Sequence, residues 1–458
     1  MNVSSGKSIV DYLKPGMHAH LVGIGGVSMR PLGLVLRSQG LIISGSDMNS
    51  SVSTDELIAK GITVHIGHNA DNIQGADCII RTAAARNDNP EIAAARALGI
   101  PVFERAQAWG VIMQHYPNAI CVSGTHGKTT TTSMITQIFM EAKKDPTVMI
   151  GGTLPLIHAG HRVGSGDTII LESCEYCNSF LNFFPTVALI LNIEADHLDF
   201  FKDLKDIQHS FRQFAQLVPE RGRVIANGDD ANTVEALEGM QYLTFGLTDR
   251  NAVHGANYSE DWRSFDVICE GTHYAHLQLS VVGRHNALNA IAACAAAYNA
   301  GLPGRTAEAA LARFTGAGRR MEYKGSYHGA DIYDDYAHHP GELHALLTAA
   351  KSLGYKRIIC AFQPHTYTRT KALFDDFVRE LKAADLPVLT DIYAAREQNF
   401  IGISSKMIAD RLEGSVYCPS LQDVTAYLKE EARPGDLILT VGAGDIYKAG
   451  DALLKPSH

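Results

Sequence analysis

The segment GTHGKTTT at residues 124–131 constrains this chain more than any other. It follows an apolar, strand-like run at residues 119–122 and precedes a stretch whose apolar residues share one helical stripe. Glycines let a backbone wrap a phosphate group, and amides at the start of the next helix point at the anion. Lys128 can reach the terminal phosphates, and Thr129 can offer its hydroxyl to magnesium. The segment therefore predicts a nucleoside triphosphate site, in preference to a threonine helix cap beside a solvated lysine.

Two segments downstream of this loop can help to hold a metal ion. The loop is a shortened G-x-x-G-K-T form of the Walker pattern, with Val122 where that pattern has glycine. Glu172 ends one strand-like run, and the sequence NIEADH at residues 192–197 ends the next. Because the carboxyl ends of parallel strands face a common crevice, we expect both segments to converge on the loop. Magnesium prefers oxygen ligands, which favours Glu172, whereas His197 taken alone is more typical of a residue that orders a loop.

Length and composition bound the class of protein. A chain of 458 residues is long enough for about three domains. The net charge of −9 argues against a general nucleic-acid binder or a binder of anionic membranes, because both need a basic surface. The N-terminus has no apolar signal-peptide core, and no stretch is long enough to span a bilayer. Scattered cysteines are typical of a reducing compartment, so we expect a cytoplasmic protein without membrane insertion.

Strand-like runs alternate with helix-like segments almost throughout, which predicts an α/β fold with largely parallel sheets. Shifts in this pattern divide the chain into three domains, at residues 1–116, 117–318 and 319–458. The expected helices include one that ends near Gln39 and one at residues 287–300. The expected strands are residues 18–22, 41–44, 119–122, 168–171, 187–191, 331–334, 357–362, 388–393 and 436–441.

Several motifs together make the chain similar to one known family. GTHGKTTT, ESCEYCNSF (172–180) and NIEADHLDFF (192–201) resemble motifs of the Mur ligases, which make the peptide stem of bacterial cell-wall precursors. Further matching motifs follow the family's order over nearly the whole chain: GIGGVSM (23–29), SGSD (44–47), GRHNALNA (283–290), DDYAHHP (334–340) and FQPHTYTRT (362–370). The resemblance implies a Rossmann-like N-terminal domain for the UDP-sugar, a phosphate-loop ATPase domain, and a Rossmann-like C-terminal domain for the amino acid.

The resemblance also implies an activity. Members of the family use ATP and Mg²⁺ to phosphorylate a carboxylate, and an amine then attacks the acyl phosphate. Within the family the motifs most resemble those of the members that add the first amino acid, so the implied substrates are UDP-N-acetylmuramate and L-alanine. The implied metal-site residues are Thr129, Glu172 and His197, and His126 would face the muramyl group. Lys128 would spread the charge that gathers on the transferred phosphoryl group.

The resemblance assigns further residues to the nucleotide and to the substrates. Domain closure would bring the C-terminal residues to the ATP and keep water from the acyl phosphate. The implied ATP-binding residues are Gly124, Thr125, Gly127, Lys128, Thr129, Thr130, His285, Asn289, Arg319, Arg320 and Asp335. The implied substrate-binding residues are Gly25, Gly26, Ser46, Asp47, His68, Thr82, Arg105, Glu175, Tyr336, His338, His365 and Arg369. Among these, Arg369 can grip a carboxylate with two parallel hydrogen bonds.

Three other functions are alternatives to the ligase. The first, a nicotinamide-dependent oxidoreductase, is less favoured because the phosphate loop at residues 124–131 has no role in simple hydride transfer. GIGGVSM with Asp47, 22 residues beyond Gly25, has nearly the spacing of a nicotinamide dinucleotide site, although Ser28 replaces the third glycine. A murein tripeptide-recycling ligase would share the scaffold, and a non-catalytic nucleotide-binding regulator would share the loop.

The chain departs from the family at two places. It has Thr82-Ala83 where many relatives have a serine pair, and Thr366 where some relatives have an arginine. The chain is expected to act as a monomer or a homodimer.

Overall fold

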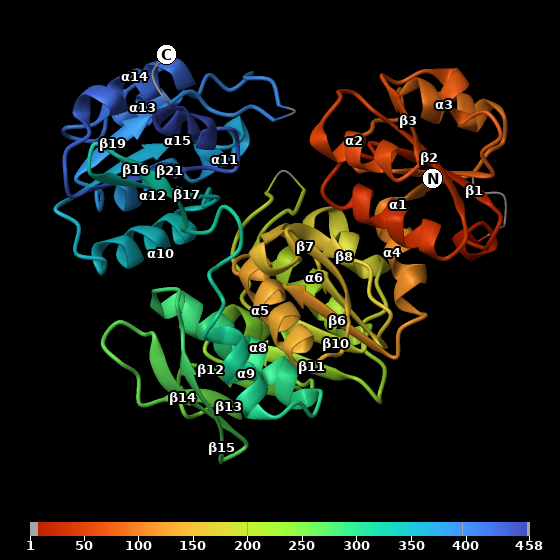
Figure 1. The fold of residues 1–458 in the computed structure, drawn as a ribbon, viewed down its shortest axis with the longest axis horizontal. Helices are drawn as coiled ribbons and strands as arrows, with labels where there is room; N and C mark the ends of the chain where they lie inside the picture. Colours follow the sequence, from red (N-terminus) through yellow and green to blue (C-terminus); the bar gives the residue numbers. More distant parts are fainter. Residues whose placement is uncertain (1–7, 199, 396, 456–458) are drawn as a thin grey trace.

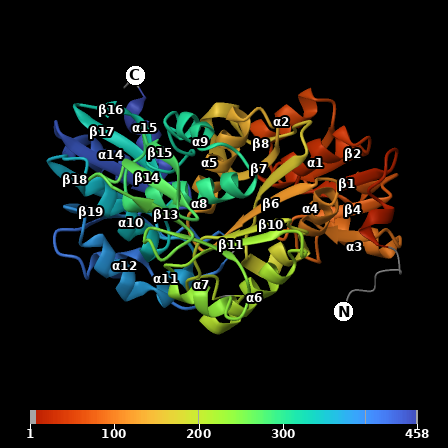
Figure 2. The same cartoon turned by 90° about the horizontal axis from the view of Figure 1, so that it is seen from below.

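The computed structural model describes residues 8–198, 200–395 and 397–455 (Figure 1). Three β-sheets, of five, ten and six strands, form three lobes that follow one another along the chain. The central lobe lies between the other two, and Figure 2 shows the same arrangement from below. The α/β class is therefore confirmed. The expectation of no signal peptide concerns an N-terminus whose first seven residues lie outside the described part of the chain.

The N-terminal lobe is a five-stranded parallel sheet in the order β3-β2-β1-β4-β5, as expected for a Rossmann-like domain. Asn89 begins one of its helices because the side chain accepts hydrogen bonds from the amides of Glu91 and Ile92. The strands are β1 (His18–Val22), β2 (Ile42–Asp47), β3 (Thr63–Ile66), β4 (Cys78–Arg81) and β5 (Val102–Glu104), and the helices are α1 (Met29–Ser38), α2 (Val52–Ala59), α3 (Pro90–Ala97) and α4 (Arg105–Met113), with short 3₁₀ turns η1 (Ile9–Asp11) and η2 (Ala70–Ile73).

The central lobe carries the phosphate loop between β6 (Asn118–Ser123) and α5 (Lys128–Glu141). Strand β6 lies between β9 (Thr168–Glu172) and β10 (Val187–Ile190), and all three are parallel. Their carboxyl ends therefore meet at one edge, as predicted. The other elements are β7 (Thr147–Leu154), η3 (Pro155–Ile157), β8 (Ala159–Arg162), η4 (Tyr176–Asn182), α6 (Leu204–Gln216), β11 (Arg223–Asn227), α7 (Ala231–Ala236), β12 (Leu243–Gly246), β13 (Val253–Ala256), β14 (Ser264–Cys269), β15 (Thr272–Gln278), α8 (Arg284–Asn299) and α9 (Gly304–Leu311).

The C-terminal lobe is a six-stranded sheet in the order β16-β17-β21-β18-β19-β20. It is parallel except at its β16–β17 hairpin, and the central sheet is likewise antiparallel at β7–β8 and β13–β15. Its elements are β16 (Glu322–Tyr327), β17 (Ala330–Asp335), α10 (Pro340–Lys351), β18 (Arg357–Phe362), α11 (Tyr367–Ala372), α12 (Phe374–Leu381), β19 (Leu386–Leu389), α13 (Ser405–Ala409), β20 (Val416–Tyr417), α14 (Leu421–Glu431), β21 (Asp436–Val441) and α15 (Tyr447–Leu454).

One predicted strand is half wrong. The strand expected at residues 388–393 is β19 at Leu386–Leu389, and the chain leaves the sheet after Leu389. The amide of Tyr393 instead donates to Pro364 O at 2.8 Å, and Thr366 N donates to Tyr393 O at 2.9 Å. The apolar run therefore continues as a segment that supports the loop of FQPHTYTRT. Smaller shifts occur in β2, expected at residues 41–44, and in α8, which begins three residues earlier than expected.

Candidate active site

The phosphate loop is held by glycines in conformations that other residues adopt poorly. Gly124 has φ of 144°, and a Cβ there would lie 2.9 Å from Leu191 Cβ. Gly127 has φ of 82°, and a Cβ there would lie 2.6 Å from Asn289 Oδ1. Asn289 Oδ1 also accepts a hydrogen bond from the hydroxyl of Thr131 at 3.2 Å. The loop therefore packs tightly between the end of β10 and helix α8, with no room for a side chain at either glycine.

Lys128 folds back over the loop. Its Nζ donates to Gly124 O and, at 3.0 Å, to Thr125 O, and it lies 3.2 Å from Glu175 Oε2. Glu175 is 2% exposed. Burial alone would lower the pKa of Lys128, but the charges of Glu175 and Glu172, with the hydrogen bond to Glu175, together outweigh it and raise the pKa well above the usual range. The ammonium is therefore charged and already held at the loop, next to the place where phosphates would bind.

The predicted metal residues lie together in part. Thr129 Oγ1 donates to Glu172 Oε1 at 3.1 Å, and the other Glu172 oxygen accepts from Gly151 N at 2.7 Å. His197 lines the same cavity, but its ring lies tilted against that of Tyr176, with centroids 4.6 Å apart, and its Nε2 lies 3.7 Å from Asp196 Oδ2. A hydroxyl beside a carboxylate suits Mg²⁺, so Thr129 and Glu172 fit that ion well.

One cavity of about 920 Å³ joins half of the predicted site residues. It is bounded by the phosphate loop, by Glu172 and by C-terminal residues, and Val27 of the GIGGVSM segment reaches it from the N-terminal lobe. All three lobes thus meet at this space. The site residues of the sequence analysis that line it are Thr125, His126, Gly127, Lys128, Thr129, Glu172, His197, Arg319, Arg320, Tyr336, His338, His365 and Arg369.

A second cavity, of about 450 Å³, extends from the loop between α8 and α10. It is lined by most of the residues that the resemblance assigns to the nucleotide: Gly127, Thr129, Thr130, His285, Asn289, Arg320 and Asp335. Arg319, which the resemblance also assigns to the nucleotide, does not line this cavity. Its Nε donates to Asp334 at 2.7 Å and its NH2 donates to Gly442 O at 2.7 Å. Its guanidinium therefore braces the C-terminal lobe. Asp335 accepts from the amides of Met321 and Ala337.

We expect His285 to give the protein a pH-dependent stability. Burial and the charge of Arg320 lower the pKa of His285 to about 4, so the folded protein keeps the ring neutral where the unfolded chain binds a proton. Stability contributed by this neutral ring is present above pH ~6.5 and is lost as pH falls toward 4, by about 2 kcal/mol for a partly exposed group. In chemical unfolding, His285→Gln should therefore flatten the acid side of the stability profile, and parallel profiles for both proteins would contradict this.

Arg369 makes an ion pair between lobes. Its Nε and NH2 donate to Asp196 Oδ1 at 3.1 and 3.0 Å, and both side chains are at most 10% exposed. Its NH1 lies 3.2 Å from His365 Nδ1. Burial alone would raise the pKa of Asp196, but the charges of Arg369 and nearby histidines hold it well below its usual range. Arg369 also lines a further cavity of about 370 Å³, so its guanidinium borders open space as well as Asp196.

His338 and Tyr336 lie at the same interface. His338 N donates to Glu342 Oε2 at 2.6 Å, and the His338 and His365 rings have centroids 5.7 Å apart. The guanidinium of Arg320 lies 5.2 Å from the centre of the Tyr336 ring. Burial lowers the pKa of His338 to about 3, so its ring is neutral at physiological pH. The predicted amino-acid residues are thus brought together, and their roles remain predictions.

The predicted UDP-sugar residues lie at the carboxyl ends of the N-terminal strands. Gly25 N donates to Asp47 Oδ2 at 2.9 Å. Ser46 Oγ donates to Glu91 Oε2 at 2.6 Å, and His68 Nδ1 lies 3.0 Å from the same oxygen. Two further residues of this set lie at Gly23: Thr82 Cγ2 is 2.7 Å from a Cβ built on Gly23, and Gly26 N donates to Gly23 O. Arg105 is the first residue of helix α4.

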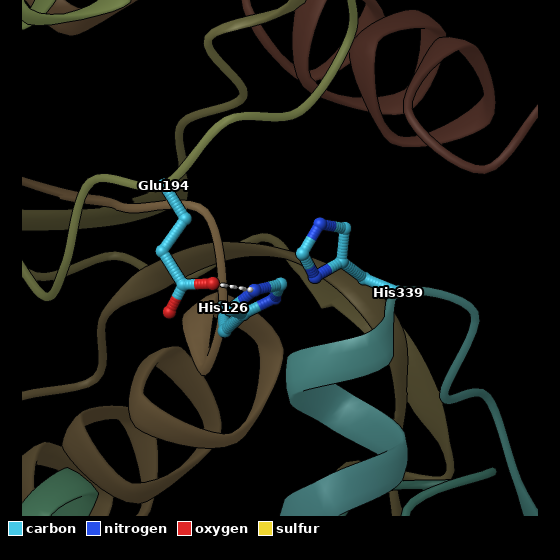
Figure 3. Close-up of side chains that lie close together, drawn as sticks. All are labelled: His126, Glu194 and His339. Atoms are coloured by element: carbon cyan, nitrogen blue, oxygen red, sulfur yellow. Dashed lines mark hydrogen bonds and ion pairs between the residues drawn. The ribbon is translucent and has the colours of Figure 1, made fainter. Parts of the chain in front are cut away.

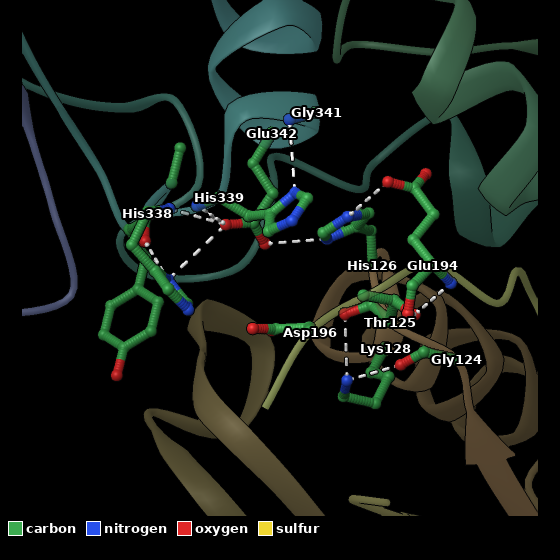
Figure 4. A network of polar contacts seen from close by, with 12 residues as sticks. Gly124, Thr125, His126, Lys128, Glu194, Asp196, His338, His339, Gly341 and Glu342 are labelled. Atoms are coloured by element: carbon green, nitrogen blue, oxygen red, sulfur yellow. Dashed lines mark hydrogen bonds and ion pairs between the residues drawn. The ribbon is translucent and has the colours of Figure 1, made fainter. Parts of the chain in front are cut away.

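Several residues of the site escaped the sequence reasoning. Figure 4 shows that His126 lies between Glu194 of the central lobe and Glu342 of α10, and that His339 lies beside it. Asp196, which pairs with Arg369, was also missed. Glu194 and Asp196 lie inside the motif NIEADHLDFF, and His339 lies inside DDYAHHP, so the sequence did contain a signal for them. A motif does not show which of its side chains face another lobe.

Known protein families and relatives match this chain over nearly its whole length. Three family models match in order: "Mur ligase family, catalytic domain" at residues 18–117, "Mur ligase middle domain" at 122–297, and "Mur ligase, glutamate ligase domain" at 319–444. The chain is 45% identical to UDP-N-acetylmuramate–L-alanine ligase of Acetivibrio thermocellus, over 96% of both chains. It is 47% identical to the enzyme of that name from Agathobacter rectalis, over 97% of this chain and 99% of the relative.

The chain is a Mur ligase.

Solved structures agree with this assignment. A UDP-N-acetylmuramate–alanine ligase from Thermotoga maritima superposes with a TM-score of 0.81 at 29% identity, over 96% of this ligase and 98% of the other chain. A murein peptide ligase from Psychrobacter arcticus has a TM-score of 0.73 at 25% identity, with the same coverage. The predicted family and the three-domain architecture of this Mur ligase are confirmed, and a nicotinamide oxidoreductase is not favoured. Among its described residues, no helix is both long and apolar enough to cross a membrane.

Proposed function

We propose that this Mur ligase uses ATP to join L-alanine to the carboxylate of UDP-N-acetylmuramate in peptidoglycan precursor synthesis. The observation that carries the proposal is the single cavity of about 920 Å³, where the phosphate loop, Glu172 and Arg369 meet residues of all three lobes. Relatives that are 45% and 47% identical over almost the full chain carry this activity in their names. The cavity thus offers a place for a phosphoryl donor, an acid and an amine within reach of one another.

The reaction follows from the chemistry of a carboxylate. Its carbon is a poor electrophile, because an oxide would have to leave when an amine attacks. A carboxylate oxygen of the muramyl group therefore first attacks the γ-phosphorus of ATP, and ADP leaves. The amine of alanine then attacks the acyl phosphate, and phosphate leaves with that carboxylate oxygen. Lys128 neutralises charge on the transferred group, and closure of the lobes around the cavity would keep water from the acyl phosphate.

The remaining assignments are part of the proposal. Thr129 and Glu172 would hold Mg²⁺, with His197 near by, and the ion would offset the charge of the phosphates. His285 and Asn289 would lie against the adenine. Arg369 would bind the alanine carboxylate; in this structure the guanidinium of Arg369 pairs with the carboxylate of Asp196 instead. We place the domain boundaries at 116/117 and 318/319 and the enzyme in the cytoplasm. All eight cysteines are free, which agrees with a reducing compartment.

A phosphate-release assay tests this function. With ATP, Mg²⁺ and UDP-N-acetylmuramate, we expect rapid release with L-alanine and much slower release with glycine, L-serine or the tripeptide of murein. Excess chelator should abolish release, because phosphoryl transfer needs the metal charge. Preference for the tripeptide would identify a recycling ligase, which the resemblance to a murein peptide ligase keeps as the second candidate. Activity that survives the chelator would contradict the metal site.

A further inference from the structure

Three potential metal ligands from two lobes face one another beside the phosphate loop, and the proposed function gives them no common role. They are His126 of the loop, Glu194 after β10, and His339 at the start of α10 (Figure 3). One ligand atom of each lies within 4.8 Å of the others. Among the described residues this is the only group of three or more histidine, cysteine, aspartate or glutamate side chains with such spacing.

The space between the three side chains is open because residue 341 is a glycine. A Cβ built on Gly341 would lie 3.3 Å from Glu194 Oε2, 3.5 Å from His126 Nε2 and 3.6 Å from His339 Nδ1. The three atoms thus lie at similar distances from this one point, which is called the central point below. Zinc binds nitrogen and carboxylate ligands at about 2.0–2.2 Å, so each side chain would move inward by about 1.3 Å. Side-chain rotation can supply a movement of this size.

The outer nitrogens of both imidazoles face oxygen atoms. His126 Nδ1 lies 3.4 Å from Glu342 Oε1, and His339 Nε2 lies 3.3 Å from Ala195 O. Each ring therefore turns its other nitrogen toward the central point. In this structure, His339 Nδ1 accepts a hydrogen bond of 3.3 Å from Gly341 N. Oxygen partners on the far nitrogen fix the tautomer and orientation of histidines that bind metals. The cluster has this arrangement for both rings.

The cluster also attracts positive charge. The two ring nitrogens of His126 lie 3.3 Å from Glu194 Oε2 and 3.4 Å from Glu342 Oε1, so two carboxylates flank the imidazole. Two imidazoles and one carboxylate suit Zn²⁺ and other late first-row ions, whereas Mg²⁺ prefers oxygen ligands.

We propose that His126, Glu194 and His339 form a Zn²⁺ site that ties the C-terminal lobe to the phosphate loop. The ion would have three protein ligands and one position open to water. It is separate from the Mg²⁺ site proposed above, where Glu172 contacts Thr129. Because the ligands come from both sides of the interface, a bound ion holds the two lobes together.

Cobalt provides the direct test, since tetrahedral Co²⁺ absorbs strongly in the visible range and octahedral Co²⁺ does not. Titration of the full, nucleotide-free chain should give one tetrahedral Co²⁺ per molecule, displaced by equimolar Zn²⁺ and retained in millimolar Mg²⁺. His339→Ala should weaken binding at least about 100-fold, and Glu342→Gln, which loosens His126, by about 10- to 100-fold.

Gly341→Ala is the sharpest variant, because it keeps all three ligands and fills the central point with a methyl group. It should weaken Co²⁺ binding at least about tenfold while the protein stays folded, since alanine favours a helix more than glycine does. His344→Ala is the matched control, because His344 lies on the same helix, is 69% exposed and pairs with Glu380. It should bind Co²⁺ like the wild type. Absence of tetrahedral Co²⁺ from the wild type, or equal affinity in the Gly341→Ala and His344→Ala proteins, would overturn the site.

Discussion

Lys128→Ala should lower kcat by about 10³-fold, the largest loss that we expect from a single substitution. A fixed positive charge on a transferred phosphoryl group contributes about 10²–10⁵ in rate in enzymes that move phosphate. Lys128 lies at the loop with its charge assured by Glu175, so the contribution should fall within this range. Single-turnover measurement of ADP formation, with saturating substrates, reports the phosphoryl step itself. A kcat within tenfold of the wild type would remove Lys128 from that step.

Stability must be separated from chemistry in this variant. The Lys128 side chain is 14% and the Glu175 side chain 3% exposed, so removal of the lysine leaves a buried carboxylate unpaired. Such a loss costs about 3 kcal/mol. The double variant Lys128→Met/Glu175→Gln removes both charges, and it should recover most of the stability without recovering kcat. If the double variant regained activity, the defect of Lys128→Ala would be one of folding.

Arg369→Lys should raise the KM for alanine by about 100-fold and leave the KM for ATP within about twofold. A guanidinium binds a carboxylate through two parallel hydrogen bonds, which an ammonium cannot reproduce. In this structure the Nε and NH2 of Arg369 both donate to one carboxylate oxygen, Asp196 Oδ1, and its NH1 faces His365. The geometry therefore suits a second carboxylate at the border of the cavity. A change in KM for one substrate alone marks a lost binding contact rather than a general defect.

Arg379→Lys provides the control for this substitution. Arg379 lies on α12 of the same lobe, is 64% exposed, and pairs with Asp376 and Glu380. Its replacement should leave every KM unchanged. An unchanged KM for alanine in Arg369→Lys would exclude Arg369 from the amino-acid site and leave it a contact between lobes. An equal rise in the KM values for ATP and alanine would point to impaired closure.

Local sequence patterns predicted the elements well where their physical cause is local. Strands β6, β9, β18 and β21 follow continuous apolar runs because they are buried on both faces of a sheet. The phosphate loop could be read directly, since its glycines adopt positive φ and its lysine follows at once. The strand expected at residues 388–393 was wrong beyond Leu389, because the chain leaves the sheet there and Tyr393, which is 39% exposed, forms an isolated bridge with His365 instead.

Contacts between lobes were beyond the reach of the same reasoning. Asp196 with Arg369 and His126 with Glu342 join residues that lie 173 and 216 positions apart, and no local period marks such partners. Arg319 shows the partners that a resemblance does not reveal. The resemblance assigns it to the nucleotide, which stays a prediction; in the structure Arg319 lines the cavity of about 920 Å³, and its guanidinium donates to Asp334 and to the carbonyl of Gly442 within its own lobe. A motif identifies a residue type, and packing decides its partner.

The fate of the carboxylate oxygen tests the central claim most directly. UDP-N-acetylmuramate labelled with ¹⁸O in its carboxylate should be incubated with the enzyme, ATP, Mg²⁺ and L-alanine, and the released phosphate should be analysed by mass. If an acyl phosphate forms at this site, each phosphate carries one labelled oxygen, and one phosphate appears for each amide bond. Phosphate without label, or ATP left intact with both substrates present, would contradict the account.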